Sequence, residues 1–257
     1  FILGVSTAWI ISTCEFRGKK FFSWALILPF AIPPYIMSYA FTGLFDSYGS
    51  ANDLVRFIFQ LDPETVPFPS VRNITGAIII FSFTLYPYVF LISQTSFLNQ
   101  SRDIFDVSRT LGLSRFKTFF KVALPIARPA IVAALMLVGM EVLSDFGAVE
   151  HFAIPTFTSG IFRTWFGLND LTTAKQLASI LFMIFLFLIL IEKYSRRKIL
   201  YTSNSTSNRE LVPTPLKGYK ELFAIIICSL PIFVGFIIPF VQLLYWTIFF
   251  DTSFFTS

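Results

Sequence analysis

Six long runs of apolar residues constrain the fold of this chain more than any other feature. A helix needs about 20 mainly apolar residues to cross the roughly 30 Å hydrocarbon core of a bilayer. Charged residues make up only 14% of the 257 residues and hydrophobic residues 55%, which leaves too little polar sequence to cover a water-soluble domain. The sequence therefore predicts an all-α polytopic transmembrane helical bundle in a lipid bilayer. The candidate spans are residues 1–13, 22–45, 74–98, 129–149, 171–191 and 222–250.

The Lys and Arg residues orient these spans. Because successive spans place the intervening segments on alternate sides, residues 14–21, 99–128 and 193–220 share one side, and they hold 16 of the 20 basic residues. Cytoplasmic loops carry such an excess of Lys and Arg, so we assign these three segments to the cytoplasm. The net charge of +5 then reflects membrane topology, and no nucleic-acid partner is predicted.

A polar interruption divides the chain. Residues 193–220 are polar and poor in bulky side chains, and a new apolar run follows them. We expect residues 1–192 to form a first membrane unit that lacks its first span or spans, because the chain opens inside an apolar run. Residues 193–220 are then a cytoplasmic linker, and residues 221–257 begin a second, truncated unit.

Prolines interrupt several of the predicted spans. Broken helices persist in lipid where neighbours satisfy the freed carbonyls, and transporters often place them at the translocation pathway. Simple packing kinks are the alternative, and the sequence leaves both open. Outside the spans, residues 46–72 are expected to form an external loop with one short helix near residues 52–60. The interrupting prolines are Pro29, Pro33, Pro34, Pro87, Pro231 and Pro239.

The most informative segment is cytoplasmic and reads DVSRTLGLSRFKTFFKVALP over residues 106–125. Gly112 falls where a short helix from about Arg102 should end, because glycine adopts the left-handed cap without steric cost. Ser114 can cap a second short helix, and Pro125 is expected to end that helix before the next span. We call this compact helix–turn–helix, residues 99–128, the knob.

The second helix of the knob separates aromatic from basic side chains. Phe116, Phe119 and Phe120 are expected on one face, at i, i+3 and i+4, while Arg115, Lys117 and Lys121 occupy the other faces. Such a helix could lie on anionic lipid, or it could dock a soluble partner. A DNA-reading motif is rejected because both ends are tied to membrane helices. The residues alone favour lipid binding and docking of a soluble partner equally.

The knob resembles the EAA loop of binding-protein-dependent ABC importer permeases. That pattern is Glu-Ala-Ala, three residues, Gly, nine residues, Ile, any residue and Leu-Pro. Here it reads Asp106-Val107-Ser108, three residues, Gly112, nine residues, Val122-Ala123-Leu124-Pro125. The spacing matches throughout, although Asp replaces Glu and its shorter side chain puts the acidic contact in doubt.

The resemblance implies the fold, the location and the partners of the chain. It implies an ABC importer permease fold, spanning the bacterial inner membrane several times, with a knob that enters a groove of separate ATP-binding-cassette ATPase subunits. The chain has no phosphate-binding G-x-x-x-x-G-K-[ST] loop, so another polypeptide must hydrolyse ATP. The implied docking residues are Asp106, Gly112, Arg115, Phe116, Phe119, Leu124 and Pro125.

A wider resemblance, to bacterial ferric-iron importer permeases, covers nearly the whole chain. It rests on LPFAIPPY at residues 28–35, LYPYV at 85–89, SDFGAV at 144–149 and TFTSGIFRTWF at 156–166. Those proteins fuse two halves in one chain, which implies that residues 1–192 and 221–257 belong to a first and a second permease half. Related permeases carry thiamine, polyamines, sulfate or phosphonates. The resemblance also implies that a periplasmic substrate-binding protein docks near residues 150–170, where interfacial anchoring by Trp165 and Phe166 is the alternative.

Two acidic residues, Glu141 and Asp145, fall in the predicted span 129–149. They are one turn apart and should share a helix face. Ionisable groups in a span usually face a cavity or a partner, and carboxylate oxygens suit a hard cation such as ferric iron. We therefore consider both as candidates for the substrate path. The alternative is that Asp145 caps a helix near the outer interface while Glu141 bonds a neighbouring helix.

No enzyme active site is predicted. The sequence shows no nucleophile–base pair, no cofactor loop and no metal-binding cluster. Cys14 and Cys228 are expected to be packing residues, and a single histidine, His151, cannot build a metal site alone. An ion-gradient-driven transporter that uses Glu141 and Asp145, or a membrane scaffold without a conduit, are competing functions. Neither of them needs an ATPase-docking knob.

Overall fold

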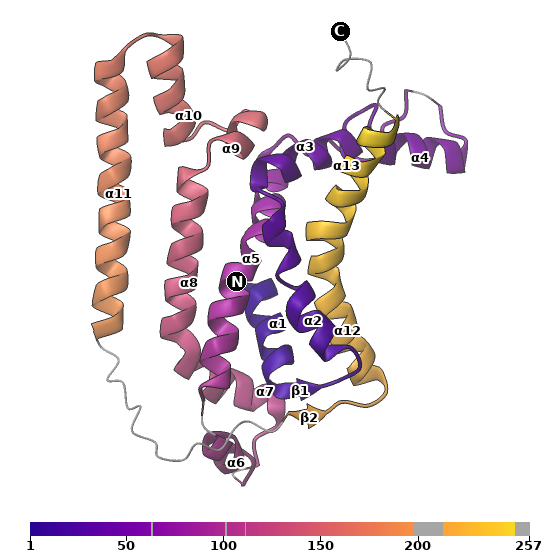
Figure 1. Cartoon of the computed structure of the whole chain (residues 1–257), viewed down its shortest axis with the longest axis vertical. Coiled ribbons are helices and arrows are strands. Elements are labelled where there is room, and N and C mark those ends of the chain that lie inside the picture. The colour runs from indigo at the N-terminus through magenta and orange to yellow at the C-terminus, as the bar shows by residue number, and fades with distance from the viewer. Residues whose placement is uncertain (63, 101, 111, 198–212, 250–257) are drawn as a thin grey trace. The chain divides into compact units, whose positions relative to one another are not determined.

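The computed structural model describes residues 1–257 apart from 63, 101, 111, 198–212 and 250–257. Most of the described chain is helical (Figure 1), which confirms the predicted all-α membrane bundle. The elements in chain order are α1 (Ile2–Thr13), β1 (Cys14–Glu15), α2 (Lys19–Ala25), the 3₁₀ turn η1 (Leu28–Ala31), α3 (Pro34–Phe45), α4 (Ser50–Phe59), α5 (Ile74–Leu98), α6 (Arg102–Thr110), α7 (Arg115–Thr118), the π-helix η2 (Phe119–Ala123), α8 (Leu124–Ser144), α9 (Gly147–His151), α10 (Phe157–Phe162), the π-helix η3 (Arg163–Gly167), α11 (Leu171–Arg197), β2 (Thr214–Pro215), α12 (Tyr219–Ile232), the π-helix η4 (Phe233–Ile237) and α13 (Ile238–Phe249).

Within the described residues, four helices are long and apolar enough to cross a bilayer. They are Ile74–Leu98, Arg115–Ser144, Leu171–Ile191 and Tyr219–Ile248. Three of them confirm the predicted spans at residues 74–98, 171–191 and 222–250. The predicted first span is the shorter apolar helix Ile2–Thr13.

The predicted span at residues 22–45 is interrupted, as its prolines allowed, and does not form one continuous helix. The helices Lys19–Ala31 and Pro34–Phe59 are bent by 88° at the break between them. The break has a local cause: Ile32 is extended, with φ −110° and ψ 106°, because a residue before proline is disfavoured in the α region. The pair adds a fifth span only if the two helices are counted together.

The predicted span 129–149 is misplaced. The helix runs from Arg115 to Ser144, so it begins well before Pro129 and stops before Asp145. Pro129 lies inside α8 without ending it. The helix therefore includes the second half of the knob, which the sequence interpretation treated as a separate element.

The chain divides into two compact units that interleave along the sequence. The first consists of Phe1–Leu26, Leu85–Val142 and Ala178–Ser229, and the second of Ile27–Thr84, Leu143–Leu177 and Leu230–Ser257. The permease halves predicted at residues 1–192 and 221–257 stay a prediction. Most of the predicted linker, residues 198–212, lies outside the described part of the chain.

In the first unit, α1 packs closely on α5. A Cβ atom on Gly4 would lie 2.6 Å from Val89 Cβ and 2.9 Å from both Phe90 N and Tyr86 O. Only glycine permits this approach, because two of these atoms belong to the backbone of α5 and cannot move aside. The Tyr86 hydroxyl in turn donates to Leu26 O at 2.7 Å in a buried position.

A short parallel strand pair joins distant parts of the same unit. Cys14 and Glu15 of β1 pair with Thr214 and Pro215 of β2. The Glu15 carbonyl accepts from Leu216 N at 2.8 Å. Cys14 is buried and free, as is Cys228, in agreement with their prediction as packing residues.

In the second unit, α3 packs against α9 and α13. The Thr42 hydroxyl lies 2.8 Å from His151 Nε2, and the Tyr39 ring lies 4.1 Å from the imidazole. Burial of His151, followed by its proximity to Arg72, lowers its pKa below the ordinary value. The single histidine is therefore a neutral packing residue at pH 7.

Replacing Gly4 by alanine should destabilise the protein. The added methyl meets the backbone of α5, and overpacking of this kind costs about 1–3 kcal/mol. The measurement is the melting temperature of the purified protein in detergent. Gly139→Ala is the matched control, because no atom lies within 4 Å of its added Cβ; equal melting temperatures for both variants would contradict the proposed contact.

Candidate functional site

The turn of the knob is built by Gly112. Its φ is +73°, a left-handed conformation, and no atom lies within 4 Å of where its Cβ would be. Leu113 N donates to Ser108 O at 3.0 Å, which is the long hydrogen bond of a Schellman cap. Gly112 is thus required for backbone conformation rather than for space, and the predicted end of the first knob helix is confirmed.

Ser114 starts the second knob helix, as predicted. Its backbone is extended, and its hydroxyl accepts from Lys117 N at 3.4 Å. The Ser114 carbonyl also accepts from Thr118 N at 2.8 Å. The two caps fix the angle between α6 and α7.

Pro125 does not end the second helix, contrary to the prediction. The widened π-turn η2 precedes it, and Leu124 N donates to Phe119 O, five residues back. Gln100 also donates from Nε2 to Ala123 O at 3.0 Å in a buried position. The helix nevertheless continues from the knob into α8 as one helix, Arg115–Ser144.

The three phenylalanines of the knob do not share one exposed face. Phe116 is 72% exposed and Phe120 49% exposed, and their ring centroids are 4.7 Å apart. Phe119 is half-buried and packs on Trp9, with ring centroids 5.0 Å apart. The Phe119 ring also lies 4.8 Å from the Phe120 ring, so the three rings are contiguous but differ in exposure: Phe116 and Phe120 form an outer pair, and Phe119 is an inner anchor.

Trp9 of α1 is a site residue that the sequence interpretation missed. Its ring lies 5.4 Å from Phe97 of α5 and 6.0 Å from Phe105 of α6, in addition to its contact with Phe119. It therefore joins both helices of the knob to two other helices of the same unit. No local pattern marks it, because all its partners lie about 90 residues or more further along the chain.

The remaining predicted docking residues lie around this anchor. Arg115 and Pro125 are exposed, whereas Asp106 and Leu124 are half-buried. Lys117 and Lys121 are also exposed. The described surface of the knob thus combines a pair of phenylalanine rings with positive charge.

Glu141 and Asp145 do not share a helix face. Glu141 is exposed in the last turns of α8, but the helix ends at Ser144 and Asp145 lies beyond it. The Asp145 carboxylate accepts from Ala148 N at 2.9 Å and from Val149 N at 3.3 Å, so it caps the short helix α9. This is the alternative that the sequence left open for Asp145.

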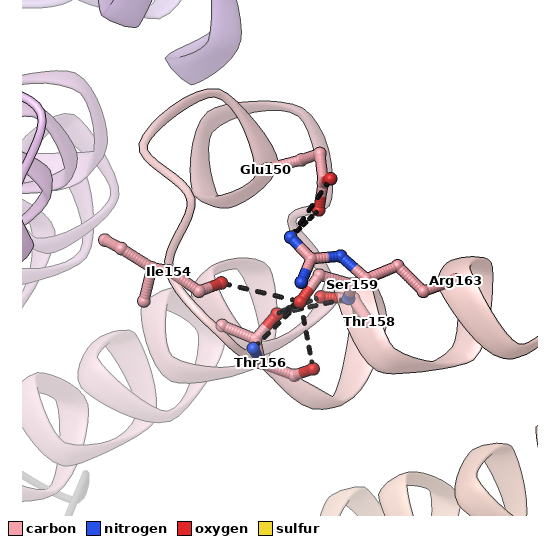
Figure 2. Close-up of polar contacts among 6 residues, drawn as sticks. All are labelled: Glu150, Ile154, Thr156, Thr158, Ser159 and Arg163. Atoms are coloured by element: carbon pink, nitrogen blue, oxygen red, sulfur yellow. Dashed lines mark hydrogen bonds and ion pairs between the residues drawn. The ribbon is translucent and has the colours of Figure 1, made fainter. Parts of the chain in front are cut away.

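The segment after α9 is held by its own polar contacts. Figure 2 shows Arg163 bridging to both carboxylate oxygens of Glu150, at 3.2 and 3.3 Å, and the reciprocal cap between Thr156 and Ser159 that starts α10. The exposed rings of Trp165 and Phe166 stack beside this frame, 4.6 Å apart. Among the described residues, no group of three or more His, Cys, Asp or Glu side chains could hold a metal ion.

The family comparison agrees with this geometry. A family model described as "Binding-protein-dependent transport system inner membrane component" matches residues 1–196. The chain belongs to this family. The match covers the knob and all of α8, and it confirms the predicted resemblance and the multi-pass location in the inner membrane.

Individual relatives of this permease family differ in what they transport. The chain is similar to the Fe(3+)-transport system permease protein FbpB 2 of Haemophilus influenzae, with 26% identity over 96% of this chain and 44% of the relative. It is 30% identical to a probable sulfate transport system permease protein, cysT of Prototheca wickerhamii, over 58% of this chain and 55% of the relative. It is 25% identical to a putative molybdenum transport system permease protein, YvgM of Bacillus subtilis, over 59% and 64%. The chain spans about half the length of these curated relatives.

Removing the Trp9 ring should loosen the knob. Trp9→Ala deletes the contacts to Phe97, Phe105 and Phe119, and the loss of such a ring costs about 2–4 kcal/mol. We expect faster tryptic cleavage after Arg115 and Lys117 in the purified protein. Trp9→Phe should largely restore protection, and Trp24→Ala, which removes an exposed ring, should cleave like the wild type. Unchanged cleavage of Trp9→Ala would contradict the anchoring role.

Proposed function

We propose that this chain forms part of the permease subunit of an ATP-binding-cassette importer, and that its knob docks a separate ATPase subunit. The observation that carries this proposal is the anchored knob: two capped helices, fixed on Trp9 and exposing Phe116 and Phe120. A gradient-driven carrier has no need for such an element. The family membership supports the same conclusion.

The exposed ring pair supplies the centre of the docking surface. Aromatic side chains that enter a partner's groove commonly dominate binding energy, with charged residues at the rim. Arg115, Lys117 and Lys121 surround the rings and are exposed, so they favour an acidic rim on the ATPase. Phe119 supports this surface from within rather than contacting the partner.

The continuous helix from the knob into α8 would transmit movement from the ATPase to the membrane. Because the helix continues through Pro125 without a break, a displacement of the docked knob moves α8 with it. ATP binding and hydrolysis by the partner would then rearrange the membrane helices. The sequence has no G-x-x-x-x-G-K-[ST] loop, so in this proposal the ATPase subunit supplies the ATP site.

The substrate that we propose is ferric iron, received from a periplasmic binding protein. The similarity to the Fe(3+) permease extends over 96% of the chain, whereas the sulfate and molybdenum permeases match 58% and 59%. Glu141 is the candidate path residue, since an exposed carboxylate on a membrane helix suits a hard cation. Arg163 and Trp165 offer a contact surface for the binding protein.

Truncating the exposed rings should weaken ATPase binding. Phe116→Ala with Phe120→Ala removes the proposed centre of the interface, and such anchors are worth about 2 kcal/mol or more, or roughly 30-fold in affinity. The measurement is equilibrium binding of the purified ATPase subunit to the detergent-solubilised protein. Arg115→Glu should also weaken binding, with a stronger effect at low salt.

Two variants serve as controls for that experiment. Phe21→Ala removes an exposed ring outside the knob, and Lys217→Glu reverses an exposed charge in another cytoplasmic segment. Both should bind the ATPase like the wild type. If the knob variants bind as tightly as these controls, the knob is not the docking site.

Neutralising Glu141 should abolish ferric iron uptake. Glu141→Gln keeps the shape of the side chain but removes its charge, so uptake of radioactive ferric iron by cells should fall to the level of cells lacking the protein. Asp145→Asn is the matched control and should retain uptake, because asparagine caps a helix about as well as aspartate. Undiminished uptake by Glu141→Gln would remove its path role. Uptake of sulfate or molybdate in place of iron would overturn the substrate while leaving ATPase docking intact.

A further inference from the structure

Helix α4, in the segment between α3 and α5, exposes the side that a helix in water would bury. Leu54, Phe57, Ile58 and Leu61 are 59%, 84%, 59% and 39% exposed, whereas Asn52 is fully buried. Leu54, Phe57 and Ile58 recur at i, i+3 and i+4, which places them on one face of α4, and Leu61 follows just beyond the end of the helix at Phe59. We call this face the outer stripe.

Asn52 fixes the direction in which the outer stripe points. Its Nδ2 donates to Phe45 O at 3.2 Å and Asp46 O at 2.8 Å, which are carbonyls at the end of α3. Its Oδ1 accepts from Phe68 N at 2.9 Å, on the segment that returns toward α5. Because three backbone groups hold this one buried side chain, α4 cannot roll to hide its apolar face.

The charged side chains of α4, Asp53 and Arg56, pair with each other outside the outer stripe. The Arg56 side chain is only 11% exposed; it pairs with Asp53 at 2.8 Å and donates from Nε to Thr65 O at 2.8 Å. It also donates to Ser47 O. The outer stripe therefore carries no charge that would select an acidic or basic partner.

One neighbour of α4, the helix α13, belongs to Tyr219–Ile248, which is long and apolar enough to cross the bilayer. Ser50, the first residue of α4, donates to Gln242 of α13 at 2.8 Å, and Trp246 lies against Gly43 of α3. In Figure 1, α4 runs sideways past the end of α13 rather than along it. A helix that lies across the end of a spanning helix lies in the plane of the membrane surface.

We infer that α4 is an interfacial helix that inserts the outer stripe into the outer leaflet of the bilayer. A helix with one apolar face and one polar face binds this way, with its apolar side about 5–10 Å into the boundary between headgroups and acyl chains. The leaflet is the outer one because a single spanning helix, α5, separates α4 from the cytoplasmic knob. The lipid contact holds the external loop at a fixed depth and supports the bend before α3.

Site-directed spin labelling of the full chain tests this inference. Single cysteines replace Leu54, Phe57 or Ile58 in a Cys14→Ala, Cys228→Ala background, and the protein is reconstituted in vesicles of phosphatidylethanolamine and phosphatidylglycerol. Collisions of the label with oxygen, which concentrates in lipid, should exceed collisions with a water-soluble nickel chelate at all three positions. Labels at Asp53 and Glu64, exposed residues outside the outer stripe, should show the reverse.

Other outcomes overturn the inference. Nickel accessibility at Phe57 equal to that at Glu64 would place α4 in water. Labels that become protected only when a purified substrate-binding protein is added would make the outer stripe a protein-docking surface instead. One further result is expected when the label is at position 54. Adding Phe57→Asp and Ile58→Asp should lower collisions of this label with oxygen and raise its collisions with the nickel chelate, while the protein stays in the membrane.

A second measurement keeps both native cysteines, so that it can be made even if the protein does not fold without them. The variants Phe57→Trp and Glu64→Trp, in the chain with both cysteines, are each compared with the wild type for fluorescence quenching by brominated lipid. Added quenching at position 57 but not at 64 supports the inference, and equal quenching at both contradicts it. Neither result depends on whether the knob binds an ATPase or which solute is carried.

Discussion

A proline inside a helix removes one backbone N–H donor, and its ring crowds the carbonyl of residue i−4; this constraint accounts for two of the irregular places in the helices. Before Pro125 and before Pro239 the chain uses the same device. The residue preceding each proline, Leu124 or Ile238, donates its N–H to a carbonyl five residues back, in a π-turn. The widened turn makes room for the proline ring within the helix. Both helices therefore continue across a residue that would end an ordinary α-helix.

This device decides what the knob can do. If Pro125 ended the helix, a flexible joint would separate the docking surface from α8, and motion of the knob would be lost there. The structure has a continuous helix instead, stiffened by the buried bond from Gln100 to Ala123 O. Trp9 completes the arrangement, because its contacts with Phe105 and Phe119 hold both knob helices to α1. In the proposed docking, a displacement of Phe116 and Phe120 by the partner would therefore move helices that pack on one another.

Features that depend on adjacent residues could be predicted from the sequence, whereas features that depend on contacts between distant residues could not. Apolar runs predicted three of the spans, Gly112 predicted the turn and Ser114 the cap, because each depends on a few adjacent residues. Pro125 was wrongly predicted to end the helix, because the π-turn before it involves hydrogen bonds to residues outside the local pattern, such as the bond from Gln100 to Ala123 O. The inward position of Phe119 and the role of Trp9 follow from partners far along the chain. The break at Pro33 was visible as a proline pair, but the 88° bend was not.

The two acidic residues of the predicted span show why a helix end matters for function. One more turn of α8 would have placed Asp145 on the face of Glu141, as a pair of carboxylates. The helix ends at Ser144 instead, and the Asp145 carboxylate accepts hydrogen bonds from the N–H groups of Ala148 and Val149. Glu141 remains on the same continuous helix as Arg115. At 1.5 Å per residue, about 40 Å of helix separates them, so in the proposed mechanism a movement of the knob would reach Glu141 along one continuous helix.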